Sequence, residues 1–505
     1  MVNLKDVEPR EYQKNIAETA GKRNTLVVLP TGMGKTLIAL LVAIKRLNEF
    51  PESKVMVMAP TRPLSAQHKK IFEKFTDLSE EEIALVTGKI KPDKRVEIYG
   101  KSKVIIATPQ TIQNDIENGR LKLDDFSLMV LDECHRCVKE YAYTFVAKKY
   151  KEQAKYPLIL GLTASPGGSF ERIEEIKENL FIDCVEIRTE TDEDVKPYVK
   201  PIAKEWIYVE LPEEMKMVKG FLERMLKDSL NWLKEHGFIS SSKPQKKILL
   251  MLQKKIASKY MSSKNSLLAL AMIKLAEAIK IEHAIELLET QEFYSFLDFL
   301  EKLKKSKKRV DKKISKDPRM EEVMKIVKSL GEIEHPKLIK LKYLIKDFLR
   351  ENPKVKIIVF ANYRSTVEKI NEVLKKEGIK CDVLVGQSTK RGKGMSQQEQ
   401  IEVLKEFKEG KFNVLIATSI GEEGLDIVAT DYAIFYEAVP SEIRAIQRRG
   451  RVGRQTAGKV IFLLAKDTRD ESYYWAAFQK ERKMKGILYD MREKSKKKTL
   501  KDWLG

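Results

Sequence analysis

The sequence predicts an α/β fold with two parallel-sheet domains and an all-helical insertion between them. Short apolar runs rich in β-branched residues alternate with helical patterns twice, at 25–162 and at 357–464. Between these parts, residues 245–317 contain neither glycine nor proline, which favours helix with few breaks. A chain of 505 residues also exceeds the size of a single core. We expect a first sheet domain at 1–204, a helical insertion at 205–335, a second sheet domain at 336–480 and a basic tail at 481–505.

Composition and charge point to a polyanionic partner. The net charge is +21 and the isoelectric point is about 9.4, so nucleic acid is the simplest partner. A solvated surface rich in Lys and Glu, as in heat-adapted proteins, is the alternative, because 33% of the residues are charged. The sequence has no apolar run of membrane-spanning length, no secretory signal and four cysteines. We therefore expect no membrane partner and a cytoplasmic location, with nucleoid association in a prokaryote.

Residues 25–36, TLVVLPTGMGKT, have the order of strand, glycine loop and helix start that binds phosphate. The glycines let backbone N–H groups turn toward a phosphate, Lys35 can reach the β- and γ-phosphates, and the Thr36 hydroxyl can bind Mg²⁺. The strict eight-residue pattern has glycine where this chain has Leu29. A plain strand–helix turn would explain the glycines but not Gly-Lys-Thr at a helix start. The expected contacts to ATP come from Leu29, Pro30, Thr31, Gly32, Met33, Gly34, Lys35 and Thr36.

Polar residues follow the other strands expected in the first sheet, at 55–59, 104–107, 128–131 and 158–162. Because ligands bind at the carboxyl ends of parallel strands, these residues should lie along one edge. They are Thr61, Arg62, Thr108, Asp132, Glu133, Thr163 and Ser165. ATP hydrolysis needs one carboxylate near Mg²⁺ and another to orient the attacking water. Asp132 suits the first role and Glu133 the second, and the upstream Gly-Lys-Thr makes a plain acidic loop the weaker interpretation.

The spacing of Cys134 and Cys137 matches a zinc or redox motif. No second pair accompanies it, because Cys184 and Cys381 are isolated and the five histidines are scattered. We therefore interpret both cysteines as packing residues. His135 should link the acidic turn to neighbouring polar groups.

The predicted insertion ends in a strongly basic segment. Apolar residues recur at three- and four-residue spacing from Leu268 to Leu288, as in a packed helix. Residues 300–319 then hold ten Lys or Arg and three acids, a net charge of +7. A basic helical surface fits contact with phosphates. A solvated helix face explains the same lysines, and the sequence leaves both interpretations open.

The second sheet domain is expected to have strands at 357–360, 383–385, 414–417, 433–436 and 460–464, but it has no phosphate loop. It has instead the arginine-rich segment 447–454, QRRGRVGR. Guanidinium groups stabilise the charge on a transferring γ-phosphate. We expect a cleft between the domains, with the phosphate loop on one side and these arginines on the other.

Together these segments resemble superfamily 2 helicases of the DExH branch. The family's motifs match Gln13, 30–36, 59–62, 108–110, 132–135, 163–165, 417–427 and 447–454. By this resemblance, Arg10 and Gln13 join the phosphate loop in binding ATP, and the Gln13 amide can pair with a donor and an acceptor of adenine. Gly424 and Asp426 contact the nucleotide, Gln447, Arg451 and Arg454 act in catalysis, and both sheet domains are RecA-like. Nucleic acid contacts fall on Thr61, Arg62, Thr108 and Thr418.

Residues 386–387, 394–400 and 418–426 resemble the group that contains the archaeal fork-DNA helicase-nuclease Hef and the Fanconi anaemia M helicase. The resemblance implies an ATP- and Mg²⁺-dependent helicase or translocase on forks and four-way junctions in DNA repair. It also implies a nuclease domain as a further part of a longer parent chain. A double-stranded RNA-dependent ATPase is the first alternative. A phosphate-loop ATPase acting on protein partners, with a purely solubilising charge, is the second.

The end of the chain predicts a peptide that docks on a partner. Residues 480–505 hold ten Lys or Arg and four acids, a net charge of +6, and we expect the lysine run to be disordered. Leu500, Trp503 and Leu504 would share one face of a helical turn. Their spacing resembles the sliding-clamp-binding peptide, although Lys497 stands where that motif prefers Gln. Packing of Trp503 on the second domain, or a lead into a further domain, is the alternative.

Overall fold

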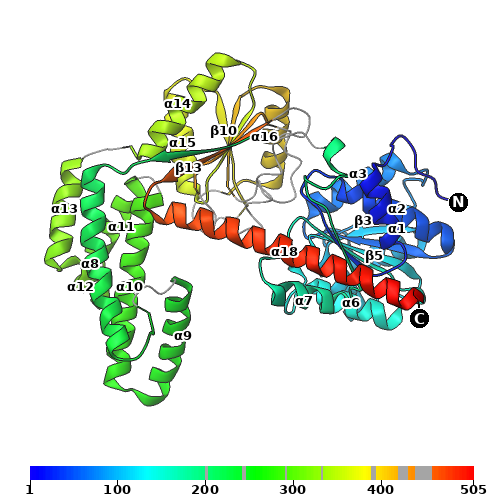
Figure 1. The fold of residues 1–505 in the computed structure, drawn as a ribbon, viewed down its shortest axis with the longest axis horizontal. Helices are drawn as coiled ribbons and strands as arrows, with labels where there is room; N and C mark the ends of the chain where they lie inside the picture. Colours follow the sequence, from blue (N-terminus) through cyan, green and yellow to red (C-terminus); the bar gives the residue numbers. More distant parts are fainter. Residues whose placement is uncertain are drawn as a thin grey trace.

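The computed structural model has two sheet domains, a helical bundle and one long helix that joins them (Figure 1). The structure describes residues 1–198, 203–241, 246–290, 293–330, 334–387, 394–418, 430–437 and 458–504, with residues 246, 247 and 495–504 described by their backbone alone. Within these ranges, no helix is long and apolar enough to span a membrane.

The first domain is a parallel sheet of seven strands in the order β3-β4-β2-β5-β6-β1-β7. Its strands are β1 (Thr25–Val28), β2 (Lys54–Met58), β3 (Ile83–Val86), β4 (Val104–Ala107), β5 (Phe126–Asp132), β6 (Ile159–Thr163) and β7 (Cys184–Ile187). Its helices are α1 (Glu11–Ala20), α2 (Lys35–Glu49), α3 (Arg62–Phe75), α4 (Pro92–Lys101), α5 (Pro109–Glu117), α6 (Ala142–Gln153) and α7 (Phe170–Asn179), with short 3₁₀ turns η1 (Cys134–Arg136) and η2 (Lys196–Tyr198). Both sheet faces are covered, because alternate residues of the strands pack into two apolar cores.

The insertion is a helical bundle. It consists of α8 (Glu213–Glu235), α9 (Lys246–Ser263), α10 (Ser266–Thr290), α11 (Phe293–Lys305), α12 (Arg309–Ser315) and α13 (Pro318–Leu330). The predicted helical spacing is confirmed, since Ala271, Leu275 and Leu288 are buried in the bundle core. The segment without glycine or proline is nevertheless more broken than expected. The chain reverses between α9 and α10 with Lys264 at a φ of +46°, so tertiary packing rather than a breaker residue ends the helix.

The second domain is a parallel sheet of six strands in the order β10-β11-β9-β12-β13-β8. Its strands are β8 (Ala203–Val209), β9 (Ile357–Phe360), β10 (Cys381–Leu384), β11 (Val414–Ala417), β12 (Tyr432–Phe435) and β13 (Lys459–Ala465), and the helices α14 (Pro336–Glu351), α15 (Arg364–Lys376) and α16 (Gln397–Glu409) pack on it.

The strand β8 lies in the second sheet although it comes before the insertion. It pairs in parallel with β13, so that Phe462 is the register partner of Trp206. The domain boundary predicted after residue 204 therefore falls inside a strand, and the bundle begins with α8. The whole bundle is thus inserted between two strands of the second sheet, which ties it to that domain.

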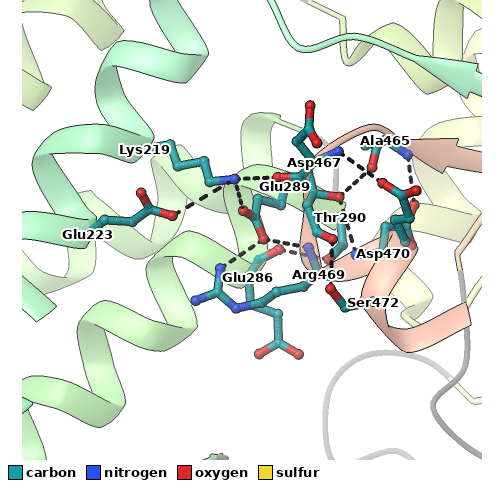
Figure 2. A network of polar contacts seen from close by, with 12 residues as sticks. Lys219, Glu223, Glu286, Glu289, Thr290, Ala465, Asp467, Arg469, Asp470 and Ser472 are labelled. Atoms are coloured by element: carbon teal, nitrogen blue, oxygen red, sulfur yellow. Dashed lines mark hydrogen bonds and ion pairs between the residues drawn. The ribbon is translucent and has the colours of Figure 1, made fainter. Parts of the chain in front are cut away.

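A buried polar network fixes the bundle to the second domain (Figure 2). Arg469 donates to both carboxylate oxygens of Glu282, at 3.1 and 2.9 Å, and to Glu289 at 2.8 Å. Lys219 Nζ lies 2.7 Å from the other oxygen of Glu289. Next to it, the fully buried Lys337 Nζ lies 2.6 Å from Asp470 Oδ2. Removing one partner of a buried pair typically costs about 3–5 kcal/mol, so these contacts stabilise the packing of α18 against the bundle and α14.

The tail differs most from its prediction. Residues Arg469–Leu504 form one helix, α18, so the boundary predicted at residue 480 and the disordered lysine run are both replaced by continuous helix. This helix starts at the junction with the bundle and runs to the first domain (Figure 1). There Met484, Leu488 and Met491 join the core of the first domain, and Tyr489 donates to Asp192 at 2.7 Å. Apolar residues spaced at three and four positions explain this docking.

Candidate active site

The phosphate loop connects β1 to α2 at the carboxyl edge of the first sheet. Gly32 and Gly34 have φ angles of +88° and +74°, which residues with side chains rarely adopt. A Cβ on Gly34 would also collide with the Gln13 side chain. Lys35 is the first residue of α2, and its Nζ donates to Leu29 O at 3.0 Å, across the loop. The loop is therefore curved around the start of a helix, where an anion is favoured.

The segment before α1 packs against this loop. Gln13 and Tyr12 both donate to Met33 O, at 3.2 and 2.8 Å, so two side chains hold the middle of the loop. The Gln13 carbonyl accepts the Arg10 N–H at 2.9 Å. The Arg10 guanidinium lies 5.1 Å from the ring centre of Tyr198, at the far end of the domain's sequence. Arg10 and Gln13 thus lie beside the loop, as expected for residues that contact the same ligand.

Asp132 ends β5, and Glu133 follows it in the left-handed conformation with φ at +51°. Asp132 Oδ1 accepts the Glu133 N–H at 3.0 Å, and Oδ2 lies 2.9 Å from His68 Nε2. Burial raises the pKa of Asp132, but the His68 hydrogen bond and the nearby Lys35 charge outweigh it and leave that pKa below its usual value. An ionised carboxylate therefore faces the phosphate loop.

Glu133 leads into a chain of polar contacts under the site. Its Oε2 is buried and makes no hydrogen bond in the described parts of the chain, although it lies 3.2 Å from His135 Nδ1. His135 Nδ1 is also 3.2 Å from Thr163 Oγ1, which accepts the Ser165 N–H at 3.1 Å. His135 thus joins the acidic turn after β5 to the polar turn after β6.

The candidate nucleic-acid residues lie farther along the same edge of the sheet. Thr61 caps the N-terminus of α3, with its side chain 3.5 Å from the Leu64 N–H, and Arg62 beside it is exposed. Thr108 directly precedes α5, and its hydroxyl lies 2.9 Å from that of Thr111. In the second sheet, Thr418 directly follows β11, with its N–H donating to Leu384 O at 3.0 Å.

Family models match three parts of this chain. "Type III restriction enzyme, res subunit" matches residues 6–168, "Helicase conserved C-terminal domain" matches 337–456, and "Putative ATP-dependent RNA helicase, helical bundle" matches 214–333. The helicase domain of Hef from Pyrococcus furiosus, a solved structure, is 46% identical with a TM-score of 0.74, and the match covers 93% of this chain and 98% of that domain. The chain belongs to the Hef family of superfamily 2 helicases. Its two sheet domains and bundle are the nucleic-acid-dependent ATPase core of such a helicase.

Longer relatives of this Hef-family helicase carry differing names. The Methanocaldococcus jannaschii protein named "Putative ATP-dependent RNA helicase MJ1505" is 45% identical over 97% of this chain and 62% of its own length. The Schizosaccharomyces pombe protein "ATP-dependent DNA helicase fml1" is 33% identical over 91% of this chain and 57% of its own length. This chain therefore spans less than two thirds of either relative.

Five residues expected in this Hef-family site lie outside the described residues. They are Gly424, Asp426, Gln447, Arg451 and Arg454. Their roles stay predictions from the motifs of the second domain.

The geometry of this Hef-family site fits a nucleotide with Mg²⁺. The left-handed glycines turn the loop at the start of α2, where an anion is favoured, and the Asp132 carboxylate and Thr36 hydroxyl offer the oxygen ligands that Mg²⁺ prefers. Glu133 Oε2 is buried and has no hydrogen bond from any residue that the structure describes, which suits a group that acts on water. Cys134 and Cys137 are not part of the candidate nucleotide site. Both are buried in the core, and burial raises the pKa of Cys137 to about 12.

His68 lies in the site of this Hef-family helicase but was not predicted from the sequence. It lies two turns into α3, and only the fold brings it to Asp132. The sequence signal for a buried His68 was weak. Ser65, His68 and Phe72 form the buried face of α3, but Ser and His are polar and are therefore expected on the surface. Arg172 is a second omission, with its guanidinium donating to His135 O at 3.0 Å.

Proposed function

We propose that this chain is an ATP-driven helicase or translocase that acts on branched DNA. One observation carries the proposal. The phosphate loop and the Asp132–Glu133 pair lie at the ends of β1 and β5, and Thr61, Arg62 and Thr108 lie at the ends of β2 and β4, on the same edge of one sheet. A nucleotide site and an anion-binding surface on one rigid sheet support the coupling of hydrolysis to movement on a nucleic acid.

In this proposal ATP binds to the loop from Leu29 to Thr36, with Arg10 and Gln13 on the base. Thr36 and Asp132 would hold Mg²⁺, which neutralises charge on the phosphates when bound. Glu133 orients the attacking water through its buried carboxylate. Gln447, Arg451 and Arg454 of the second domain complete the site as the domains close, with Gly424 and Asp426 contacting the nucleotide.

The second domain and the bundle then move as one body. Arg469 at the start of α18 pairs with Glu282 and Glu289 of the bundle, and Lys219 of the bundle donates to Asp467 O after β13 at 2.7 Å. These contacts hold the bundle to that domain, so closing of the cleft moves Thr418 and the basic end of the bundle together. A branched substrate offers two arms, one for the sheet edges and one for the bundle. The name of the fml1 relative as a DNA helicase supports DNA as the polymer.

ATP hydrolysis measured with four nucleic acids tests the proposal. The chain is mixed in turn with a DNA fork, linear duplex DNA, single-stranded DNA and double-stranded RNA, at equal nucleotide concentration and at the same salt. We expect the largest stimulation with the fork. Equal stimulation by the fork and linear duplex would contradict the preference for branches, and no stimulation by any of the four would contradict the function itself.

A double-stranded RNA-dependent ATPase is the second candidate. The names of the Methanocaldococcus jannaschii relative and of the bundle model refer to RNA helicases. Stimulation by double-stranded RNA above that by the fork would favour it.

Two partners follow from the same proposal. A nuclease domain in a longer parent chain would cut the branch that the helicase engages. A sliding clamp would dock on Leu500, Trp503 and Leu504, whose backbone is helical at the end of α18. Equal retention on clamp resin of the intact chain and of a Leu500→Ala, Trp503→Ala variant would exclude the clamp.

A further inference from the structure

His68 makes a direct contact with the candidate Mg²⁺ ligand. The His68 side chain is 2% exposed, and its Nε2 lies 2.9 Å from Asp132 Oδ2. An ionised carboxylate only accepts hydrogen bonds, so Nε2 carries the proton and donates. In the described parts of the chain, the other ring nitrogen of His68 has no hydrogen-bond partner. The imidazole therefore directs its one hydrogen bond to Asp132.

The other contacts of Asp132 involve its Oδ1 and its backbone carbonyl, so His68 is the residue that contacts Oδ2. Asp132 Oδ1 accepts the Glu133 N–H at 3.0 Å, and the Asp132 backbone carbonyl accepts the Tyr143 hydroxyl at 2.7 Å. These bonds fix the backbone and one carboxylate oxygen. The hydrogen bond to Oδ2 sets the rotation of the carboxylate, which decides where its lone pairs point.

The helix that carries His68 begins at the candidate nucleic-acid surface. Its first turn holds Thr61 and Arg62, and the buried Ser65 donates to Ala107 O at 3.3 Å, next to Thr108. His68 is six positions after Arg62, about 9 Å along a helix axis. One rigid helix thus connects the surface at the ends of β2 and β4 with the carboxylate at the end of β5.

We propose that His68 is a positioning residue that orients the Asp132 carboxylate for the Mg²⁺ of bound Mg·ATP. The proposal rests on the proposed ATP site but not on which nucleic acid the chain binds. Residues that orient metal ligands change metal affinity by about 10- to 100-fold when removed. The neutral side chains of Leu and Gln separate the two roles of the imidazole, since both fill space and only Gln donates a hydrogen bond.

Nucleotide binding without nucleic acid tests the proposal. A fluorescent ATP analogue is titrated into the wild type, His68→Leu and His68→Gln, once with Mg²⁺ and once with EDTA. In Mg²⁺ we expect His68→Leu to bind about tenfold more weakly than the wild type, and in EDTA the two should bind equally. His68→Gln should recover part of the loss. Electron paramagnetic resonance of Mn²⁺ added with ADP should give the same order of affinities without any turnover.

Two results would overturn the positioning role. One is wild-type Mg²⁺ dependence in His68→Leu. The other is an equal loss in both variants, in Mg²⁺ and in EDTA, together with an equal fall in melting temperature, which would make His68 a packing residue. Because these titrations contain no nucleic acid, they decide the role of His68 even if fork DNA fails to stimulate hydrolysis.

Discussion

The Ser165 hydroxyl donates to the sulfur of Met484 at 3.0 Å, across 319 positions of the chain. Ser165 lies in the polar turn after β6, which His135 and Thr163 connect to Glu133. Met484 lies in α18, whose first residues are fixed to the second domain and the bundle. The long helix therefore contacts the catalytic edge of one domain while it is anchored in the other. A change in the angle between the domains must bend α18, slide it or break this contact.

Truncating Met484 should weaken the first domain. Met484 is 2% exposed and packs in the core beside Leu488, so Met484→Ala should lower the free energy of unfolding by about 2–4 kcal/mol. Urea unfolding followed by circular dichroism would measure the loss. Met261→Ala is the matched control, because Met261 is 80% exposed on the bundle, and it should change stability by less than about 0.5 kcal/mol. Equal effects of the two variants would mean that α18 does not dock as described.

Substitutions of Lys35 in the phosphate loop and of Glu133 should both reduce ATP hydrolysis, and Glu133→Gln should do so without loss of nucleotide binding. Lys35→Ala removes the cation at the start of α2 and should abolish ATP hydrolysis. Glu133→Gln keeps the shape of the side chain but removes its charge, so hydrolysis should fall by about 10²-fold or more while nucleotide still binds. Steady-state hydrolysis and a binding titration measure both. Lys45→Ala, an exposed lysine in the same helix, should behave as the wild type, and wild-type hydrolysis in Glu133→Gln would remove Glu133 from the site.

The sequence anticipated the elements with strong local signals. Five of the first sheet's strands and the phosphate loop follow from apolar runs that end in polar residues. The strands β3 and β7 were missed, and both lie at an edge of the sheet, whereas β1 and β4, which are equally short, lie inside it and were predicted. The strand β8 was missed for another reason. Its alternating, half-exposed residues pair with β13, more than 240 residues later, and no local pattern records such a partner.

The site residues also divide into those that a local motif predicts and those that only the fold brings to the site. Gln13, Lys35 and Asp132 lie in short motifs, whereas His68 and Met484 reach the site only through packing of whole helices. The lysine-rich end of the chain was predicted to be disordered because that prediction used its charge and not the surface on which the helix packs. Met484, Leu488 and Met491 become buried only against the first domain, which a sequence cannot supply.

The stability of the second domain should fall in mild acid because of His335. The His335 side chain is fully buried, and its Nδ1 accepts the Lys337 N–H at 3.2 Å at the start of α14. Burial, with the nearby Lys337 charge, lowers the pKa of His335 to about 3. The unfolded chain binds the proton below about pH 6.5, so stability is complete above that pH and is lost as the pH falls toward the folded value, by up to about 1.4 kcal/mol per pH unit.

Urea unfolding at about pH 7.5 and about pH 5.5 would measure this loss. His335→Asn keeps an acceptor suited to a helix N-terminus but cannot titrate in this range. The variant should therefore lose less stability between the two pH values than the wild type. Equal losses would show that His335 is protonated, or exposed, in the folded protein.

The last prediction concerns the basic end of the bundle. Exposed lysines cover α11, α12 and the turn between them, and some are paired: Lys305 lies 3.2 Å from Glu301 and Lys313 lies 2.6 Å from Glu277. Other exposed lysines have no ion-pair partner among the described residues. They are Lys304, Lys307, Lys308, Lys312 and Lys316. Lysines without a carboxylate partner are available to phosphates.

Replacing Lys304, Lys307, Lys308 and Lys312 by Ala should weaken binding to fork DNA and flatten its salt dependence, with the logarithmic slope falling by about 0.9 for each phosphate that the bundle no longer neutralises. Unstimulated ATP hydrolysis should stay near the wild-type rate, because the catalytic edge lies in the first domain. Fluorescence anisotropy at several salt concentrations measures affinity and slope together. A variant lacking Lys346, Lys369, Lys376 and Lys411, all close to carboxylates on the second domain, removes the same charge elsewhere. If both variants show equally reduced affinity and slope, the bundle contributes only to the overall charge of the molecule.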